Sequence, residues 1–216
     1  MCTTTALAKQ VKLPRVYAIV DADALRGRGI ALKDYAEALH AEGVRMVQYR
    51  DKSAGAREIL GAVAVLRGAM PDAVLILNDR ADLAVLSGCD GVHVGQGDLS
   101  VADARVVMGA GMVGVSTHNA VQVRAADLSV ADYVAVGPVF ATGSKADAEA
   151  VVGLEFVRVA RGMTTKPLVA IGGITAKNAV SVLAAGANCV AVISALLPEG
   201  GETVRESVRR FVDAIC

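Results

Sequence analysis

Three cationic side chains stand at the ends of apolar runs that are typical of buried strands. Arg50 and Lys52 come at the end of the run 46–51, and Lys145 follows the run 133–138. Arginine offers a fork of parallel N–H donors and lysine a point charge, and both bind phosphate oxygens well. Each residue alone could be a solvated or ion-paired surface group. Together, at strand ends, they predict a site for a phosphate or a pyrophosphate.

Two carboxylates follow the next strands along the chain. Asp79 ends the apolar run 73–79, with Asn78 beside it, and Asp98 follows the run 91–95. Proteins commonly hold Mg²⁺ with one or two carboxylates, and water and substrate phosphate complete the ligand set. Either aspartate could instead cap the helix that follows it. Capping does not explain why both stand beside the cationic residues, so we expect Asp79 and Asp98 to bind Mg²⁺.

Glycine and small polar residues end the last two apolar runs. Gly172-Gly173 closes the run 167–173, and Ile193-Ser194 closes the run 189–195. In many barrels the loops at these two places bind a phosphate through backbone N–H groups, and glycine lets the anion approach. A tight turn would explain either pair alone. The two together predict a second phosphate site, and the long connection 139–152 is expected to form a lid over the mouth.

The elements that must position these residues alternate along the chain. Strand starts recur every 18 to 34 residues, with helical apolar spacing between them, which is the scale of a βα unit. An open doubly wound sheet would concentrate its site at one switch point. Eight strands and polar clusters after at least six of them favour a single (β/α)8 TIM barrel, of the α/β class, over 15–216, after a loose arm at 1–14. Strands are expected at 16–21, 46–51, 73–79, 91–95, 112–118, 133–138, 167–173 and 189–195, and helices near 31–42, 56–68, 80–87, 100–108, 119–127, 153–161, 176–185 and 202–214.

Composition excludes several classes of protein. The chain is 54% hydrophobic, yet no uninterrupted apolar run reaches the roughly 18 residues of a membrane span. Strands buried on both faces of a parallel sheet explain such runs better. Lys+Arg and Asp+Glu both number 22, without a basic stripe, so no nucleic-acid partner is expected. The cysteines lack disulfide or zinc spacing, and no signal peptide is evident. We therefore expect reduced thiols, a cytoplasmic location, and Cys89 and Cys189 in the core.

Two further patterns have weaker functional meaning. The stretch 109–114 spells G-x-G-x-x-G, but it closes a helix and opens a strand, whereas a dinucleotide fingerprint follows a strand and opens a helix. His93 lies inside an expected strand and is more typical of a satisfied core residue. His118 stands two residues after Ser116 at a strand end, where it is better placed to reach a substrate.

Seven ordered blocks resemble the thiamine phosphate synthase family over about residues 15–215. Any one block would be a weak signal, but seven in the same order are highly specific. The blocks are Gln48-Tyr49-Arg50-Asp51-Lys52, Asn78-Asp79, Gly91-Val92-His93-Val94-Gly95-Gln96 with Asp98, Gly114-Val115-Ser116 with His118, Gly137-Pro138-Val139-Phe140 with Thr142 and Lys145, Ala170-Ile171-Gly172-Gly173-Ile174, and Val192-Ile193-Ser194. The chain departs from the family at Ala141, usually Pro, and at Ser144, usually Thr.

The resemblance implies an activity and a set of site residues. The family couples 4-amino-2-methyl-5-hydroxymethylpyrimidine diphosphate to a thiazole phosphate, plain or carboxylated, and releases pyrophosphate with one Mg²⁺ per subunit at Asp79 and Asp98. By its pattern the pyrimidine diphosphate would contact Gln48, Arg50, Lys52, Asn78, Ser116 and Lys145, and the thiazole phosphate would contact Thr142, Gly143, Ser144, Gly173, Ile193 and Ser194. Tyr49, Asp51 and His118 are also expected to contact substrate, and Arg50, Lys52, Ser116 and Lys145 to be catalytic.

Three rival functions fit parts of this pattern. A thiazole tautomerase shares the barrel but has no need of the diphosphate and metal residues together. A sugar-phosphate isomerase or epimerase shares the phosphate loops but would show an isolated acid or cysteine base, and a non-catalytic regulator would have eroded strand ends. We expect coupling to be the function, with small-molecule substrates and no membrane or nucleic-acid partner. We also expect a monomer or small homo-oligomer.

Overall fold

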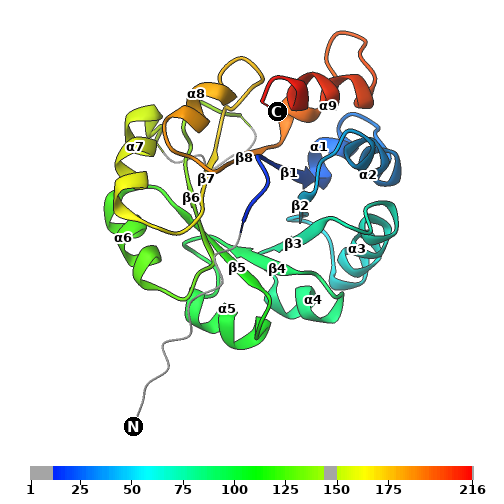
Figure 1. Ribbon diagram of the computed structural model, residues 1–216. Helices are drawn as coiled ribbons and strands as arrows, with labels where there is room; N and C mark the ends of the chain where they lie inside the picture. The colour runs from blue at the N-terminus through cyan, green and yellow to red at the C-terminus, as the bar shows by residue number, and fades with distance from the viewer. Residues whose placement is uncertain (1–11, 144–149, 216) are drawn as a thin grey trace.

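The computed structural model describes residues 12–143 and 150–215. Its eight parallel strands pair in sequence order and close into a barrel, because β1 also pairs with β8 (Figure 1). The strands are β1 (Val16–Asp21), β2 (Met46–Arg50), β3 (Val74–Asn78), β4 (Gly91–Val94), β5 (Met112–Thr117), β6 (Tyr133–Val136), β7 (Leu168–Ile171) and β8 (Cys189–Val192). The expected TIM barrel is confirmed, and the bounds of every strand lie within three residues of those expected.

Helices follow the strands and form the outer ring of the molecule. They are α1 (Ala22–Arg26), α2 (Leu32–Ala41), α3 (Ala56–Ala69), α4 (Ala81–Leu86), α5 (Val101–Met108), α6 (Ala120–Leu128), α7 (Gly153–Met163), α8 (Ala179–Ala184), the 3-10 helix η1 (Ser194–Leu196) and α9 (Val204–Asp213). The sequence did not predict α1 or η1, since five and three residues are too few for a helical period. In the described part of the chain, every helix is too short or too polar to cross a membrane.

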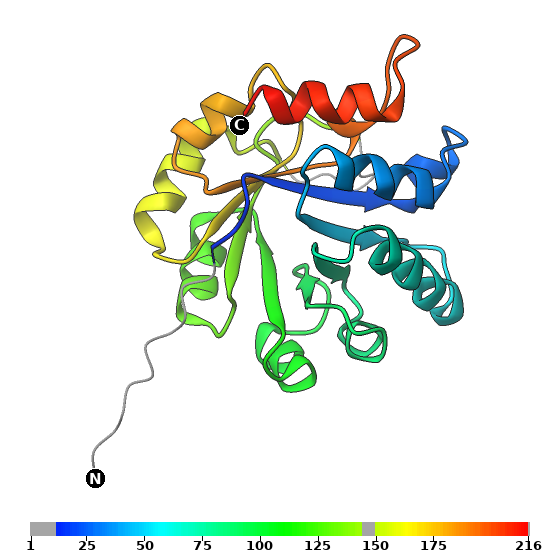
Figure 2. The ribbon, with the colours of Figure 1, turned by 45° about the vertical axis from the view of Figure 1, so that its right-hand side comes forward.

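The last helix, α9, lies beside the seam of the barrel, where the first and last strands pair. A capping box starts α9, in which the Thr203 hydroxyl accepts from the Glu206 N–H and the Glu206 carboxylate accepts from the Thr203 N–H. The helix then packs against α2 (Figure 2). Arg209 and Arg205 both pair with Glu42 at the end of α2 and lower the pKa of that carboxyl to about 2. This contact holds α9 beside the seam where β1 meets β8.

The core consists of two layers, because side chains alternate between the two faces of each strand. On β2, Val47 and Tyr49 face the helices, whereas Met46 lies in the barrel interior. Both layers are buried, which explains why the strands read as continuous apolar runs. The expected core thiols are confirmed for Cys89 and Cys189, which are buried and free, and burial raises the pKa of each. Residues 1–11 of the expected arm at 1–14, Ser144, Lys145 and Cys216 lie outside the described residues.

A glycine on β5 makes room for a tyrosine inside the barrel. A Cβ atom on Gly114 would lie 2.0 Å from the ring of Tyr133, which is fully buried. That separation is far below van der Waals contact, so even a methyl group at this position must displace the ring. The G-x-G-x-x-G pattern therefore has a packing role at its last glycine, and α5 ends before it while β5 begins within it, as expected.

We predict that Gly114→Ala lowers the free energy of unfolding by about 1–3 kcal/mol, because the added methyl overpacks the interior. Gly61, in the exposed middle of α3, is the matched control, since a Cβ there would meet nothing within 4 Å. Gly61→Ala should raise the free energy of unfolding by about 0.5–1 kcal/mol through helix propensity. Urea denaturation of both variants measures the contrast, and equal effects would contradict the packing role of Gly114.

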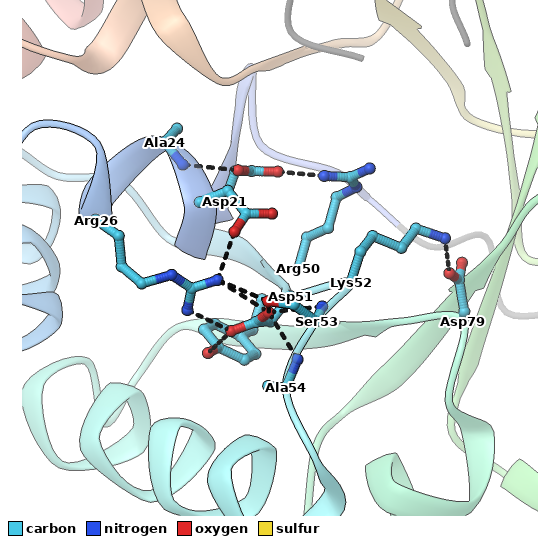
Figure 3. A network of polar contacts seen from close by, with 11 residues as sticks. Asp21, Ala24, Arg26, Arg50, Asp51, Lys52, Ser53, Ala54 and Asp79 are labelled. Carbon is cyan, nitrogen blue, oxygen red and sulfur yellow. Dashed lines mark hydrogen bonds and ion pairs between the residues drawn. The ribbon is translucent and has the colours of Figure 1, made fainter. Parts of the chain in front are cut away.

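Two residues of the expected substrate set, Tyr49 and Asp51, take part in structural contacts. The Asp51 carboxylate accepts hydrogen bonds from Arg26, Ser53 and the Ala54 N–H, and its side chain is only 2% exposed (Figure 3). Tyr49 points outward into the layer between strands and helices, where its hydroxyl contacts Asp51. Neither side chain is among those that line the two cavities at the carboxyl ends of the strands. This pair ties β2 to α1, and the expected contact of Tyr49 and Asp51 with substrate stays a prediction.

We predict that Asp51→Asn lowers the free energy of unfolding at neutral pH by about 1–2 kcal/mol, since Arg26 is half exposed and its charge is screened. The Arg26 guanidinium holds the pKa of Asp51 well below its ordinary value. A depressed folded-state pKa gives stability that is present above the unfolded-state pKa and is lost as the pH falls through the folded-state pKa. The difference between wild type and variant should thus shrink below about pH 4.

Urea denaturation over a series of pH values measures this difference. Asp72→Asn is the control, because Asp72 is exposed in the turn before β3 and has no hydrogen bond to the described residues. It should change stability by less than about 0.5 kcal/mol at every pH. An Asp51→Asn deficit that does not depend on pH would show that lost packing, not the ion pair, explains the effect.

Candidate active site

Two adjoining cavities open at the carboxyl ends of the strands. The larger cavity, of about 630 Å³, is bounded mainly by β1 to β5, and the smaller one, of about 270 Å³, by β5 to β8. They share five lining residues, so the two spaces meet along one wall. Charged residues concentrate in the larger cavity: Asp21, Asp23, Arg50, Lys52, Asp79 and Asp98. The shared wall consists of Ser116, Ala135, Ile171, Ala191 and Ile193.

The two described cations of the expected phosphate site lie in the larger cavity. Arg50, the last residue of β2, pairs with Asp21, the last residue of β1, and Lys52 pairs with Asp79 after β3 (Figure 3). Asp21 also accepts from the Ala24 N–H and so caps α1. The short helix that sequence analysis missed therefore fixes the carboxylate that orients Arg50. Gln48 and Asn78 line the same cavity.

The two expected metal ligands lie next to one another in the lining of the larger cavity. Burial raises the pKa of Asp79 above its ordinary value, Lys52 lowers it, and the neighbouring Asp98 carboxylate raises it. Asp79 has a φ of 59°, which is rare for a residue with a side chain, and its N–H donates to the His93 carbonyl at 2.8 Å. Among residues 12–143 and 150–215, no group of three or more His, Cys, Asp or Glu side chains is placed to hold a metal ion. Two carboxylates are what a Mg²⁺ with phosphate and water ligands takes from a protein.

Helix capping does not account for either aspartate. The N-cap of α4 is Arg80, which makes no side-chain cap hydrogen bond, and the N-cap of α5 is Ser100, which accepts from the Asp103 N–H. The Asp98 carboxylate instead accepts from the Gly95 N–H at 2.7 Å and holds its own loop. Helix capping therefore does not explain Asp79. It does not explain Asp98 either, but the carboxylate of Asp98 stabilises its own loop.

The smaller cavity contains four of the six residues expected to hold the thiazole phosphate, and a fifth, Ser144, lies outside the described residues. Thr142, Gly173, Ile193 and Ser194 line it, together with His118, whereas Gly143 is an exposed residue that lines neither cavity. The His118 Nδ1 is 2.6 Å from the Gly137 carbonyl oxygen. A carbonyl only accepts hydrogen bonds, so Nδ1 of His118 carries a proton.

The glycines after β7 have a packing reason as well as the expected one. Gly172 and Gly173 have φ values of 100° and 63°. A Cβ on Gly172 would lie 2.4 Å from Pro138, and one on Gly173 would lie 2.5 Å from the Ala141 carbonyl. The loop after β6 therefore packs directly against these glycines, and a side chain at either position would displace it. Both glycines also line the smaller cavity.

A buried polar network crosses the barrel interior below the larger cavity. The Gln48 amide donates to the Tyr17 hydroxyl at 2.7 Å, and Tyr17 lies 3.1 Å from the Tyr133 hydroxyl. His93 joins Tyr133 through Nδ1 at 3.0 Å and Ser116 through Nε2 at 2.9 Å. Sequence analysis missed Tyr17 and Tyr133, since a tyrosine in an apolar strand reads as core. The expected satisfied core role of His93 is confirmed, but the residue also lines the larger cavity.

Comparison with known proteins gives consistent results over nearly the whole chain. The family model described as thiamine monophosphate synthase matches residues 16–196. A thiamine-phosphate synthase from Koribacter versatilis is 51% identical over 204 residues, which cover 93% of this chain and 97% of that protein. Another from Myxococcus xanthus is 46% identical over 190 residues, covering 86% of this chain and 85% of that protein.

Solved structures give the same picture of the fold. Thiamine phosphate pyrophosphorylase from Pyrococcus furiosus matches with a TM-score of 0.81 and 31% identity, over 93% of this chain and 94% of that one. A 4-hydroxy-2-oxoglutarate aldolase, with a TM-score of 0.72 but 20% identity over 94% of each chain, shares the fold alone. Because the family model spans the barrel from β1 to η1 and the identity of the relatives is high, the chain belongs to the thiamine monophosphate synthase family.

Proposed function

We propose that this protein is a thiamine-phosphate synthase, which joins 4-amino-2-methyl-5-hydroxymethylpyrimidine diphosphate to a thiazole phosphate and releases pyrophosphate. The observation that carries the proposal is that two cavities adjoin one another. Charged side chains line the larger cavity, and mainly uncharged residues line the smaller one. A diphosphate and a phosphate need separate sites, and a coupling reaction needs the sites to touch. The 51% identity to a curated relative over nearly its whole length supports the same activity.

The charged residues of the larger cavity would stabilise the leaving group. Arg50 and Lys52 are held by Asp21 and Asp79 in the free protein and can turn their donors to phosphate oxygens when a diphosphate enters. Asp79 and Asp98 would hold Mg²⁺, which adds positive charge next to the departing pyrophosphate. Lys145, outside the described residues, is proposed for the same role.

The reaction is then a substitution at the pyrimidine CH₂ group. The C–O bond to the diphosphate breaks, and the aminopyrimidine ring spreads the resulting positive charge. The thiazole nitrogen donates its electron pair to the same carbon, and the C–N bond forms. The aliphatic side chains of the shared wall, Ala135, Ile171 and Ala191, would limit the approach of water to the cation. Little acid–base chemistry is needed, so the charged side chains of the site would act mainly by electrostatic stabilisation.

A thiazole tautomerase is the alternative within this family. Such an enzyme would use the smaller cavity and His118 but would have no use for the charged set Arg50, Lys52, Asp79 and Asp98. The presence of that set in a cavity of about 630 Å³ favours coupling. We further propose a cytoplasmic location, because the described thiols are free and buried, and a monomer or small homo-oligomer.

We predict that the purified protein forms thiamine phosphate from the two substrates only when Mg²⁺ is present. Product can be followed by fluorescence after oxidation to thiochrome. Chelation of Mg²⁺ should abolish product, because the repulsion between Asp79, Asp98 and the diphosphate would be left without a compensating charge. A folded protein that produces nothing with Mg²⁺ would exclude the synthase, and thiazole isomerisation would be measured next.

We also predict that Asp98→Asn lowers coupling at least tenfold, equivalent to about 1.4 kcal/mol of transition-state free energy. The amide oxygen can still accept from the Gly95 N–H, so the loop should keep its shape while the site loses one negative charge. The Mg²⁺ concentration for half-maximal rate should rise in parallel. Asp72→Asn, an equal change of charge in an exposed turn, should have wild-type kinetics. Lys145→Ala is expected to lower the rate by a similar factor, and unchanged turnover in both site variants would refute the assignment.

A further inference from the structure

The polar network inside the barrel has a direction that can be deduced atom by atom. The Gln48 amide nitrogen has no lone pair to offer, so it donates to the Tyr17 hydroxyl oxygen, 2.7 Å away. The contact between the Tyr17 and Tyr133 hydroxyls, at 3.1 Å, would allow either one to donate. We assign Tyr17 as the donor, because its proton has no other acceptor in this network, and the Tyr133 proton then goes to Nδ1 of His93, at 3.0 Å.

The same reasoning continues to the edge of the cavity. If Nδ1 of His93 accepts, a neutral imidazole carries its proton on Nε2, which donates to the Ser116 hydroxyl at 2.9 Å. Ser116 lies on the wall that the two cavities share. With its oxygen accepting from His93, its own proton can be donated to an acceptor atom of a ligand in the cavity.

Burial gives this arrangement its rigidity. Tyr17 is 1% exposed and Tyr133 is fully buried, and burial raises the pKa of both hydroxyls far above the usual value, so both keep their protons. The Tyr133 ring stacks on His93 at a centroid separation of 5.5 Å, and Tyr17 meets Tyr133 edge to face at 6.2 Å. Gly114 supplies the space for this stack.

We propose that Tyr17 and Tyr133 are positioning residues that fix His93 as its Nε2–H tautomer and thereby make Ser116 a hydrogen-bond donor to the pyrimidine diphosphate. This inference rests on the proposed function for its substrate, but the tautomer itself belongs to the free protein. His118 supplies an internal contrast, because the Gly137 carbonyl requires a proton on Nδ1 of that residue.

The tautomer is measured directly by NMR on substrate-free protein labelled with ¹⁵N in histidine. The chain has three histidines, so His40→Gln and His93→Gln are enough to assign the signals. We expect the Nε2–H pattern for His93 in the wild type and a mixture of tautomers in Tyr133→Phe. A wild-type His93 with its proton on Nδ1, or an unchanged pattern in Tyr133→Phe, overturns the proposal. This readout stands even if the wild type fails to couple the substrates, which would refute only the proposed function.

Kinetics give the second readout. Tyr133→Phe should lower kcat at least tenfold while KM for the thiazole phosphate changes little, because the donor orientation matters most in the transition state. Tyr17→Phe, one bond further away, should give a smaller loss in the same direction and serves if Tyr133→Phe does not fold. His93→Gln, which keeps an N–H donor and an acceptor, should retain more activity than His93→Leu.

Tyr35→Phe is the matched control for losing a buried hydroxyl. Tyr35 is 1% exposed, lies in the layer between helices and strands, and its hydroxyl has no hydrogen-bond partner among the described residues. It should keep wild-type kcat and the wild-type histidine spectrum. A Tyr133→Phe variant that matches Tyr35→Phe in kcat would show that the tyrosine pair only fills space.

Discussion

Closure of the sheet is the constraint on which the rest of this molecule depends. Val16 of β1 pairs with Val190 of β8, and every other strand pairs with its neighbours in sequence. With all strands parallel, closure brings eight carboxyl ends to one rim, so residues more than a hundred positions apart share two cavities. Closure also buries both faces of each strand. The high apolar content and the scattered polar clusters of this sequence therefore have the same physical origin.

What the sequence could predict followed the periodicity of strands and helices. The strand bounds, the rim on which the polar residues lie and the proximity of Asp79 to Asp98 depend on local pattern plus topology. The direction of a single side chain follows from pattern only inside a strand. Tyr49 sits between two inward-facing residues of β2, and strand alternation predicts that it points toward the helices. The contacts of Asp51, which follows the strand, could not be predicted in this way, because its partner Arg26 belongs to a five-residue helix without a readable period.

The interior tyrosines show a second limit of pattern reading. An apolar strand that contains Tyr17 or Tyr133 has the same periodicity as one that contains phenylalanine. Only the three-dimensional structure reveals that the hydroxyls meet each other and His93. The one signal in the sequence was Gly114, since a glycine within a strand often marks close approach of another group. Likewise Gly172 and Gly173 were expected for the sake of an anion, yet contact with the loop after β6 already requires them.

The two rims of the barrel use charge in opposite ways. At the amino-terminal rim, an acidic or amide side chain before each of three even-numbered strands accepts from an N–H in the first two residues of the preceding strand and from an arginine on a helix: Asp90 with Arg67, Asp132 with Arg105, and Asn188 with Arg161. These oxygens are saturated by the protein itself, so this rim contributes stability. At the carboxyl rim, Arg50 and Lys52 pair with single carboxylates that line an open cavity. Such pairs can exchange one anionic partner for another, and that exchange is what binding of a diphosphate requires.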